Sequence, residues 1–292
     1  MFPGERKIAS IEKSVDFTRM RKYNIKSFRE EAGVMGTKQY MKNYKITLQY
    51  DGTRYRGWQV QKSTDATIQG KLQAVLESLA GHPVEVIGSG RTDAGVHASG
   101  QVANFHMDEQ FGAQEIFAHL NRYLPEDIAV TEIEEVEDRF HSRFQAVSKT
   151  YCYRIHTSQI PNVFERKYVY TYTEPLDVER MRRAAQRLTG THDFASFCGN
   201  KHMKKSTVRT IMDISFVQKD GELEIQYTGD GFLQNMVRIL TGTLIEVGSG
   251  RREPESMGEI LAAKNREAAG YTAPPQGLRL EKVNYGTVVG DK

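Results

Sequence analysis

The chain has 292 residues, of which 39% are apolar and 26% charged, a composition typical of a soluble globular protein that excludes wholesale disorder. No apolar run approaches the roughly 20 residues that cross a bilayer, so the sequence predicts no membrane-spanning helix and no membrane partner. Residues 1–40 hold nine Lys or Arg and five Asp or Glu, and residues 41–292 sum to −1, so the net charge of +3 does not by itself indicate a nucleic-acid-binding protein.

The first 41 residues form a predicted N-terminal extension. Residues 1–40 are polar, mixed in charge and without a regular apolar period, and they lack the apolar core of a signal peptide. Three interpretations stay open. The segment is a dispensable, disordered extension, or it precedes a true start at Met41, or, less favoured, it is a basic arm that contacts nucleic acid.

Residues 42–145 predict the order strand, helix, strand, strand, helix, strand. The first strand alternates apolar and polar residues, as a strand with one buried face does, and the helices carry apolar residues every three or four positions. The predicted elements are a strand at 44–50, a helix at 67–80, strands on either side of 88–101, a helix at 113–123 and a strand at 128–136. This order is that of a ferredoxin-like, split βαβ unit. Trp58, the single tryptophan, fits a core position better than a platform for a ligand.

Residues 146–288 repeat that order loosely. The predicted elements are a strand at 147–156, a helix after Asp177, strands at 210–217 and 222–228 joined by the turn Asp220-Gly221, a long helix from Phe232 to Gly248, a short helix after Pro254 and a strand at 280–288. We therefore predict an α+β fold. Two ferredoxin-like halves, 42–145 and 146–288, share a mostly antiparallel sheet with helices on its outer face and face each other across a central cleft.

The segment Gly88–Gln101 is the most distinctive stretch of the chain. It holds four glycines in fourteen residues between two predicted strands, and it carries Arg91 and Asp93 two residues apart. A glycine-rich bend with rigid flanks can present such a charged pair to a ligand. A plain hairpin loop with a solvated ion pair is the alternative, because glycine and aspartate are ordinary turn residues.

Motifs of several reaction classes are missing from the sequence. Its eight histidines are scattered without HExxH, and Cys152 and Cys198 lie 46 apart without CxxC, so we predict no metal site. The cysteine usage fits a reducing compartment, and we expect the cytoplasm. The sequence has no P-loop and no GxSxG, and a strand rather than a helix follows the glycines of the bend, which argues against a dinucleotide fold. A cysteine nucleophile assisted by the histidine four residues on is an unsupported alternative.

Two local basic clusters remain, at 139–149 and 201–209. The second contains Lys201, Lys204, Lys205 and Arg209 without an acid. A basic cluster is most often a solvated face, so neither indicates nucleic-acid binding when taken alone.

Five strings of the sequence, in order, resemble the TruA family of tRNA pseudouridine synthases. They are Tyr50-Asp51-Gly52-Thr53-x-Tyr55-x-Gly57-Trp58-Gln59-x-Gln61, Gly90-Arg91-Thr92-Asp93-Ala94-Gly95-Val96-His97-Ala98, Phe140-His141-Ser142-Arg143-Phe144 with Lys149-Thr150-Tyr151-x-Tyr153, Gly231-Phe232-Leu233-x-x-Met236-Val237-Arg238-Ile239 with Gly242, and Pro274-Pro275-Gln276-Gly277-Leu278. The resemblance covers about residues 42–286. The first 40 residues depart from the family pattern.

The resemblance implies that uridine in tRNA is isomerised to pseudouridine, at positions 38, 39 and 40 of the anticodon stem-loop, without metal or other cofactor. It makes Asp93 the catalytic carboxylate, either as a nucleophile at C1′ or as a base for the C2′ proton, and the sequence does not choose between these roles. Arg91 and Arg238 are expected to hold Asp93 ionised by lowering its pKa. Tyr151 is expected to stack on the flipped uracil, with core packing as the alternative, and Leu278 to form an apolar wall.

The resemblance also implies the RNA-binding residues and partners. Phe140, His141, Ser142, Arg143 and Phe144 match the family's RNA-contacting segment. Lys201, Lys204 and Lys205 lie where the family has a tRNA-contacting loop, and we assign Arg209 to the same face. The partners implied are tRNA, bound in the central cleft, and a second copy in a homodimer.

Two alternatives compete with this interpretation. One is an RNA-binding protein on the same fold that has lost catalysis. The other is an unrelated enzyme with an aspartate nucleophile, such as a phosphotransferase, which is expected to show phosphate-binding glycines at a helix N-terminus or Mg²⁺ ligands.

Overall fold

The computed structural model describes residues 40–200 and 202–286. These residues form one compact unit. The predicted extension over 1–41 lies outside them except for its last two residues, and Met41 is already the first residue of a strand. Within the described residues, every helix is too short or too polar to span a bilayer.

Strands and helices alternate along the described residues much as the sequence predicts. The strands are β1 (Met41–Tyr50), β2 (Ile87–Gly88), β3 (His97–Asp108), β4 (Ile128–Val136), β5 (Ala146–His156), β6 (Tyr170–Thr171), β7 (Gly190–Asp193), β8 (Val208–Lys219), β9 (Glu222–Gly229) and β10 (Leu278–Tyr285). The α-helices are α1 (Ile68–Ala80), α2 (Ala113–Tyr123), α3 (Val178–Gln186), α4 (Met236–Gly248) and α5 (Met257–Ala263). The short strands β6 and β7 have no counterpart among the predicted elements.

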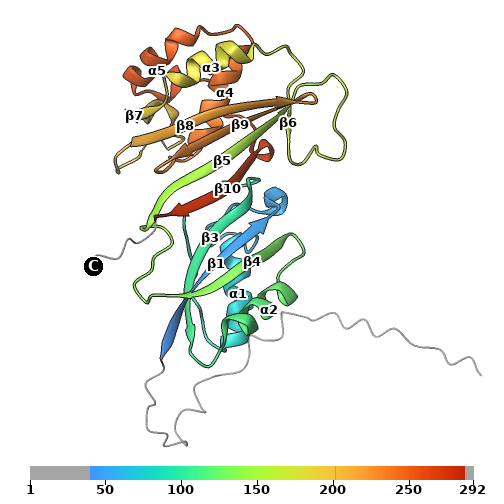
Figure 1. Ribbon diagram of the computed structural model, residues 1–292, viewed down its shortest axis with the longest axis vertical. Helices are drawn as coiled ribbons and strands as arrows, with labels where there is room; N and C mark the ends of the chain where they lie inside the picture. The colour runs from blue at the N-terminus through green and yellow to red at the C-terminus, as the bar shows by residue number, and fades with distance from the viewer. Residues whose placement is uncertain (1–39, 201, 287–292) are drawn as a thin grey trace, which may run out of the picture. The chain divides into compact units, whose positions relative to one another are not determined.

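All of these strands belong to one sheet, in the order β4-β1-β3-β10-β5-β9-β8-β7, with β2 paired to β3 and β6 to β5 (Figure 1). The sheet is mostly antiparallel, and its parallel pairs are β3 with β10 and β5 with β6. The predicted α+β fold with a mostly antiparallel sheet is therefore confirmed. The first half of the chain contributes the order β4-β1-β3-β2, and the second half contributes the order β10-β5-β9-β8-β7 with β6 paired to β5.

The two halves of the sheet meet where β10, the last strand in the sequence, lies beside β3. Arg279 pairs with His97 and Leu280 with Ala98 in a parallel register. The backbones approach so closely here that a Cβ added at Gly100 would collide with the carbonyl oxygen of Glu281. The described residues thus form one unit with a shared sheet, and the division at residues 145 and 146 stays a prediction.

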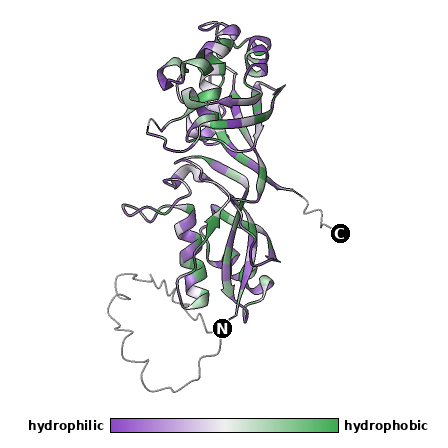
Figure 2. Cartoon of the chain, turned by 90° about the vertical axis from the view of Figure 1, so that its left-hand side faces the viewer, coloured by the Kyte–Doolittle hydropathy of each residue, from purple (hydrophilic) through white to green (hydrophobic). Residues whose placement is uncertain are grey.

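Helices α1 and α2 cover one face of the first half of the sheet (Figure 2). Tyr44, Ile46 and Leu48 of β1 are buried, whereas the residues between them are partly exposed, as the alternating pattern predicts. On the helix side, α1 begins after Thr67, whose hydroxyl accepts a hydrogen bond from Gly70 N, and it buries apolar residues that include Leu72. Burial of one face on each element is the main stabilising contribution to this layer.

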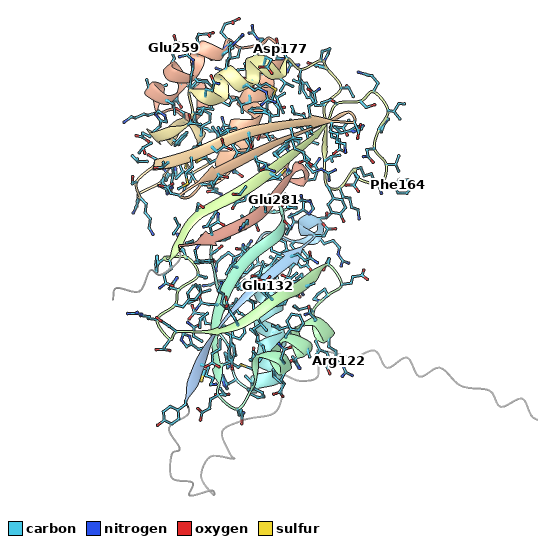
Figure 3. All side chains as sticks on the ribbon, viewed as in Figure 1. Arg122, Glu132, Phe164, Asp177, Glu259 and Glu281 are labelled. Atoms are coloured by element: carbon cyan, nitrogen blue, oxygen red, sulfur yellow. The ribbon has the colours of Figure 1, made fainter. Side chains whose placement is uncertain are left out.

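Helix α4 is the central helix of the second half. Eleven of its residues are buried, and α3 packs against it (Figure 1). Asp177, labelled in Figure 3, caps α3 by accepting a hydrogen bond from Arg180 N at 3.0 Å. The predicted start of the long helix at Phe232 is wrong. The helix begins at Met236, because Asn235 adopts the left-handed conformation with φ +59°, which cannot continue a right-handed helix.

Candidate active site

The glycine-rich bend connects β2 to β3, and the loop that contains Trp58 is hydrogen-bonded to it. Trp58 N donates a hydrogen bond to Thr92 O at 3.0 Å, and the Thr92 hydroxyl lies 2.9 Å from the hydroxyl of Tyr50. The contact requires glycine at residue 57, which has φ +97° and where an added Cβ would lie 2.7 Å from Thr92 O. Trp58 is 2% exposed, so the predicted core role of this residue is confirmed.

A buried polar network fixes the first half of the bend. Ser89 Oγ donates to Gln101 Oε1 at 2.7 Å, and Gln101 Nε2 donates to Gly90 O at 3.2 Å. Ser89 and Gln101 are both fully buried. Buried hydrogen bonds of this kind are lost only at a high free-energy cost, so the network holds the bend in one conformation before any ligand arrives.

Asp93 lies on the bend opposite Arg238, and the two charged groups come from different halves of the chain. Arg238 Nη1 is 4.0 Å from Asp93 Oδ2, with side chains 15% and 31% exposed. Burial raises the pKa of Asp93 above its ordinary value, and the charge of Arg238 and the backbone N–H of Asn235 offset part of that effect. The expected net lowering of this pKa is therefore wrong in direction, because desolvation outweighs the ion pair.

Arg238 is held in place independently of Asp93. Its Nε donates to Ala273 O at 2.7 Å and its Nη1 donates to Asn235 Oδ1 at 2.9 Å. Asn235, in the left-handed conformation, thus precedes the first residue of α4 and orients Arg238 in the first turn of that helix. Burial lowers the pKa of Arg238, and the Asp93 charge opposes this shift.

Arg91 occupies a different position from the one expected. Its side chain is exposed at the surface of the bend. Within the described part of the chain, Asp93 forms its ion pair with Arg238 and not with Arg91. The predicted holding role therefore falls to Arg238, and the Arg91 side chain is exposed to solvent.

Tyr151 and Leu278 are both buried close to the bend. Tyr151, on β5, is 8% exposed and packs edge-on against Phe232 with ring centroids 5.2 Å apart. Burial raises the pKa of the Tyr151 hydroxyl, and the negative charge of Asp93 adds to the shift, so the hydroxyl stays protonated at neutral pH. Leu278 is 5% exposed at the start of β10. Just before it, Pro275 lies over the bend, 3.0 Å from the position of a Cβ added at Gly95.

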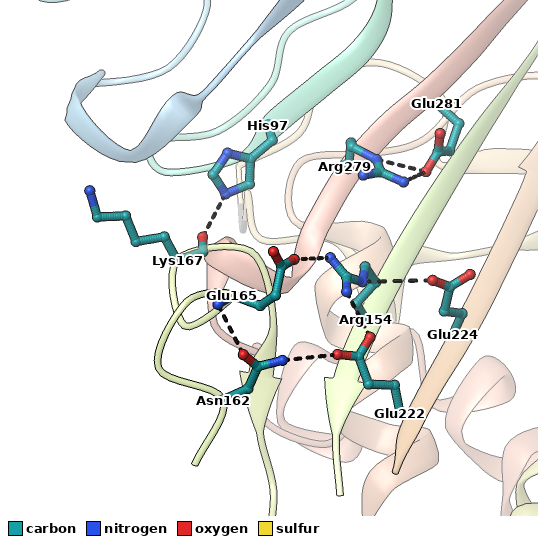
Figure 4. Close-up of polar contacts among 9 residues, drawn as sticks. All are labelled: His97, Arg154, Asn162, Glu165, Lys167, Glu222, Glu224, Arg279 and Glu281. Atoms are coloured by element: carbon teal, nitrogen blue, oxygen red, sulfur yellow. Dashed lines mark hydrogen bonds and ion pairs between the residues drawn. The ribbon is translucent and has the colours of Figure 1, made fainter. Parts of the chain in front are cut away.

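His97, at the end of the bend, joins it to the loop between β5 and β6 (Figure 4). Its Nε2 donates to Lys167 O at 3.0 Å, the contact drawn in Figure 4. Its Nδ1 accepts a hydrogen bond from Gly52 N, also at 3.0 Å, and the two bonds together suit the neutral tautomer. Burial lowers the pKa of His97, which favours the same form. The loop is tied down in turn by Glu165, which accepts from Arg154 at 2.9 Å. The sequence analysis missed this role, although His97 is part of the quoted motif.

The segment 140–144 divides into one buried residue and more accessible neighbours. Ser142 is fully buried, and its hydroxyl donates to Ile87 O at 2.6 Å. The predicted RNA contact of Ser142 is therefore wrong, because no part of its side chain reaches solvent. Phe140 packs on Tyr285 with ring centroids 5.3 Å apart. The ring centroids of His141 and Phe144 are 4.1 Å apart, and Phe144 is 78% exposed. Arg143 is exposed as well.

The second basic cluster borders a cavity of about 630 Å³. Its cationic lining residues are Lys204, Lys205, Lys264 and Arg266. The sequence analysis missed the last two, since they follow α5, about sixty residues farther along the chain. Arg209 does not line the cavity, and its guanidinium donates to Ser206 O at 3.0 Å. Lys201 lies outside the described residues.

A backbone hydrogen bond links this cavity to the turn before α4, which carries the residues around Arg238. Asn200 is one of its lining residues. The preceding Gly199 donates its N–H to Gln234 O at 2.8 Å, next to the Asn235 that contacts Arg238. The basic cluster and the Asp93–Arg238 pair are therefore connected through the turn before α4.

Metal and thiol chemistry find little support in the side-chain arrangement. Among the described residues, no group of three or more His, Cys, Asp or Glu is placed to hold a metal ion. Cys152 and Cys198 are buried free thiols. Burial raises the pKa of Cys152 to about 12, which argues against the cysteine nucleophile considered from the sequence.

Comparisons with known proteins point to one family. A family model described as tRNA pseudouridine synthase matches residues 46–145 and 184–286. Proteins named tRNA pseudouridine synthase A from Bacillus sp. (strain KSM-64) and Geobacillus sp. (strain WCH70) are 49% and 46% identical over 245 residues, which is 84% of this chain and 100% and 98% of theirs. A tRNA pseudouridine synthase A 2 from Bacillus anthracis is 45% identical over 84% of this chain and 100% of its own.

Two similar solved structures are more distant in sequence, at 8% and 9% identity. A chain from the crystal structure of a Cbf5-Nop10-Gar1 complex aligns with a TM-score of 0.34 and 8% identity, over 81% of this chain and 48% of that one, a likeness too weak to bear on fold or function. The sequence matches are decisive, because the family model covers more than half of the chain and the relatives are matched over nearly their whole length. The chain belongs to the TruA family of tRNA pseudouridine synthases, which are isomerases.

Proposed function

We propose that this chain isomerises uridine to pseudouridine at positions 38, 39 and 40 of the anticodon stem-loop of tRNA, with Asp93 as the catalytic carboxylate. The observation that carries the proposal is the position of Asp93, a partly buried residue of the family motif. It lies on a bend that buried hydrogen bonds hold in place, and its carboxylate is 4.0 Å from the guanidinium of Arg238. A carboxylate so placed suits a reaction that needs one ionised, positioned oxygen.

In this reaction the N1–C1′ bond breaks, the uracil rotates, and a C5–C1′ bond forms. C5 then loses its proton, and N1 gains one, so the product is an isomer of the substrate. Asp93 either attacks C1′ or removes the proton from C2′, and both roles require its ionised form. Burial raises the pKa of Asp93 and so opposes ionisation, whereas the Arg238 charge and the Asn235 N–H lower this pKa and favour the ionised carboxylate.

Tyr151 and Leu278 are proposed to contact the flipped uracil. A tyrosine ring stacked on a base contributes about 1–3 kcal/mol of binding. The protonated Tyr151 hydroxyl can donate a hydrogen bond to the base or pass a proton, and Leu278 supplies an apolar wall next to it. Core packing against Phe232 remains the competing role for Tyr151.

RNA binding is proposed for the remaining predicted residues other than Ser142. They are Phe140, His141, Arg143, Phe144, Lys201, Lys204, Lys205 and Arg209. Exposed Arg91 is free to contact the substrate as well. Flipping a uridine out of a stem costs a few kcal/mol, which phosphate contacts over a wide surface can offset. The cavity lined by Lys204 and Lys205 extends this surface through Arg266, whereas its Lys264 is paired with Asp193 at 2.9 Å.

The finer features of the fold and assembly belong to the same proposal. The strand orders β4-β1-β3-β2 and β10-β5-β9-β8 support two ferredoxin-like halves, with tRNA in a central cleft between them. We also propose that the protein acts as a homodimer in the cytoplasm.

The proposal is tested by incubating the protein with an unmodified tRNA transcript and mapping pseudouridine along it. We expect product at positions 38, 39 or 40 that carry uridine, and none in a matched transcript with cytidine there. Binding of the transcript without any product would instead support the catalytically inactive RNA-binding protein.

A further inference from the structure

Lys149 is a basic residue of β5 whose ammonium lies directly over the catalytic bend. Its Nζ donates a hydrogen bond to Ser89 O at 2.7 Å. A Cβ added at the neighbouring Gly90 would lie 2.8 Å from this Nζ, so the absence of a side chain at Gly90 makes room for the ammonium. On either side, β5 is paired with β9 and β10, which fixes the backbone of Lys149 within the sheet.

The Lys149 charge is not neutralised by the protein. Among the described residues, no carboxylate lies within ion-pair distance of its ammonium, and the charged group that acts on it most is another cation, Arg143. Burial and Arg143 together lower the pKa of Lys149 to about 8. An ammonium has three N–H donors, and Ser89 O accepts only one of them. A partly buried cation without a counter-ion is unfavourable, so the arrangement calls for an anion from outside.

Two further cations gather at the same short segment. Arg91 directly follows Gly90 and is exposed. Arg143 directly follows Ser142, which is anchored to Ile87 by its 2.6 Å hydrogen bond, and it is exposed too. The strand β5, the loop after β4 and the bend therefore each bring one cation to residues 87–91.

We propose that Lys149, together with Arg91 on the bend and Arg143 on the loop after β4, binds a backbone phosphate of the RNA next to the target nucleotide. This inference rests on the proposed function, since it assumes that the target uridine is bound at Asp93. Ammonium and guanidinium groups are the common partners of phosphate oxygens, and such contacts fix the register of a nucleic acid on a protein. Lys149 would thus place the phosphate while Asp93, on the same bend, acts on the sugar.

The test measures tRNA binding in the catalytically disabled Asp93→Asn background, over a series of salt concentrations. Loss of one phosphate contact lowers the slope of log K against log salt by about 0.7 to 0.9. We expect this decrease for Lys149→Met, together with about tenfold weaker binding at moderate salt, and near-parental behaviour for Lys149→Arg. Lys219→Met, at the exposed hairpin between β8 and β9, is the matched control and is expected to change neither value.

A second measurement uses the protein with native Lys149 and does not depend on how the variants fold. Acetylation of Lys149 by a small amine-reactive ester is followed by mass spectrometry, with and without tRNA. We expect tRNA to protect Lys149, and inorganic phosphate at equal phosphate concentration to protect it much less, which separates an RNA phosphate from a free anion.

An unchanged salt slope in Lys149→Met, or no protection by tRNA, would overturn the inference and leave Lys149 as a clamp on Ser89 O. A purely structural clamp would leave the salt slope unchanged, and Lys149→Met in the otherwise wild-type protein would lower kcat. Failure of the proposed function has a different signature. In that case the parental protein forms no pseudouridine, whatever the salt dependence of the Lys149 variants.

Discussion

Replacing Arg238 by methionine removes the cation beside Asp93 while keeping a long, unbranched side chain in its place. Arg238 opposes the effect of burial on Asp93, so its loss raises the pKa of the carboxyl further. A higher pKa means a smaller ionised fraction at any pH near it. We therefore expect the acidic limb of the pH profile of kcat/KM to move to higher pH.

The size of this shift follows from the 4.0 Å separation of the two charges. At that distance a pair of unit charges interacts by about 1 kcal/mol in bulk water and about 4 kcal/mol at the effective dielectric constant of a protein surface. One pKa unit corresponds to about 1.4 kcal/mol. Because both side chains are partly exposed, we expect a shift of about one to two pH units.

The assay is release of tritium from tRNA labelled at uridine C5, measured across the acidic range. The matched control is Arg238→Lys, which keeps the charge but loses hydrogen bonds to Ala273 O and Asn235 Oδ1, and its limb should move less. The Tm of each variant, compared with that of the wild-type protein, shows whether the substitution has destabilised the fold around the turn before α4. A limb that stays in place in a folded Arg238→Met protein would refute the role of this charge.

Three further predictions concern the bend and its surroundings. Gly57→Ala should lower both Tm and activity, because its Cβ would lie 2.7 Å from Thr92 O. Gly81→Ala is the control: nothing lies within 4 Å of its Cβ, so it should lower the free energy of unfolding by only about 1 kcal/mol, for its left-handed backbone. Equal losses of Tm in the two variants would contradict this reasoning. Ser142→Ala should destabilise the fold by about 1–3 kcal/mol and leave tRNA affinity unchanged. Phe144→Ala should weaken tRNA binding and leave stability unchanged. Weaker tRNA binding in Ser142→Ala alone would refute the separation of a structural Ser142 from an RNA-binding Phe144. Lys149→Met should raise Tm at pH 7. The folded-state pKa of Lys149, about 8, is below the ordinary 10.5, so the Lys149 contribution to stability rises by up to about 3 kcal/mol between pH 8 and 10.5. The Tm advantage of Lys149→Met over the wild-type protein should therefore shrink over this range, and an advantage that stays constant would contradict the reasoning.

Elements with a local periodic signal were predictable from the sequence. The alternating residues of β1 and the 3–4 spacing in α1 and α2 are properties of neighbouring residues, and they mark the buried face directly. The start of α4 was mispredicted, because the apolar spacing continues through residues 232–235 although Asn235 leaves the helical conformation. The central position of β10 depends on pairing between Arg279 and His97, far apart in the chain, which no local pattern encodes.

For the candidate site too, the sequence predicted the identity of key residues but not the properties that depend on tertiary packing. The resemblance identified Asp93 and Arg238 as partners, and the structure brings them together. It did not reveal the net direction of the Asp93 pKa, because desolvation depends on everything packed around the carboxyl. Ser142 looked like a surface residue among aromatic and basic neighbours, but its acceptor, Ile87 O, lies 55 residues away. Lys264 and Arg266 join the basic cavity only through tertiary packing.

The central claim is that Asp93 of this chain carries out the isomerisation, and tritium release from tRNA labelled at uridine C5 tests it most directly. The wild-type protein should release tritium. Asp93→Asn should unfold as cooperatively and bind tRNA about as tightly, yet release none. Substantial release by a folded Asp93→Asn protein would contradict the account.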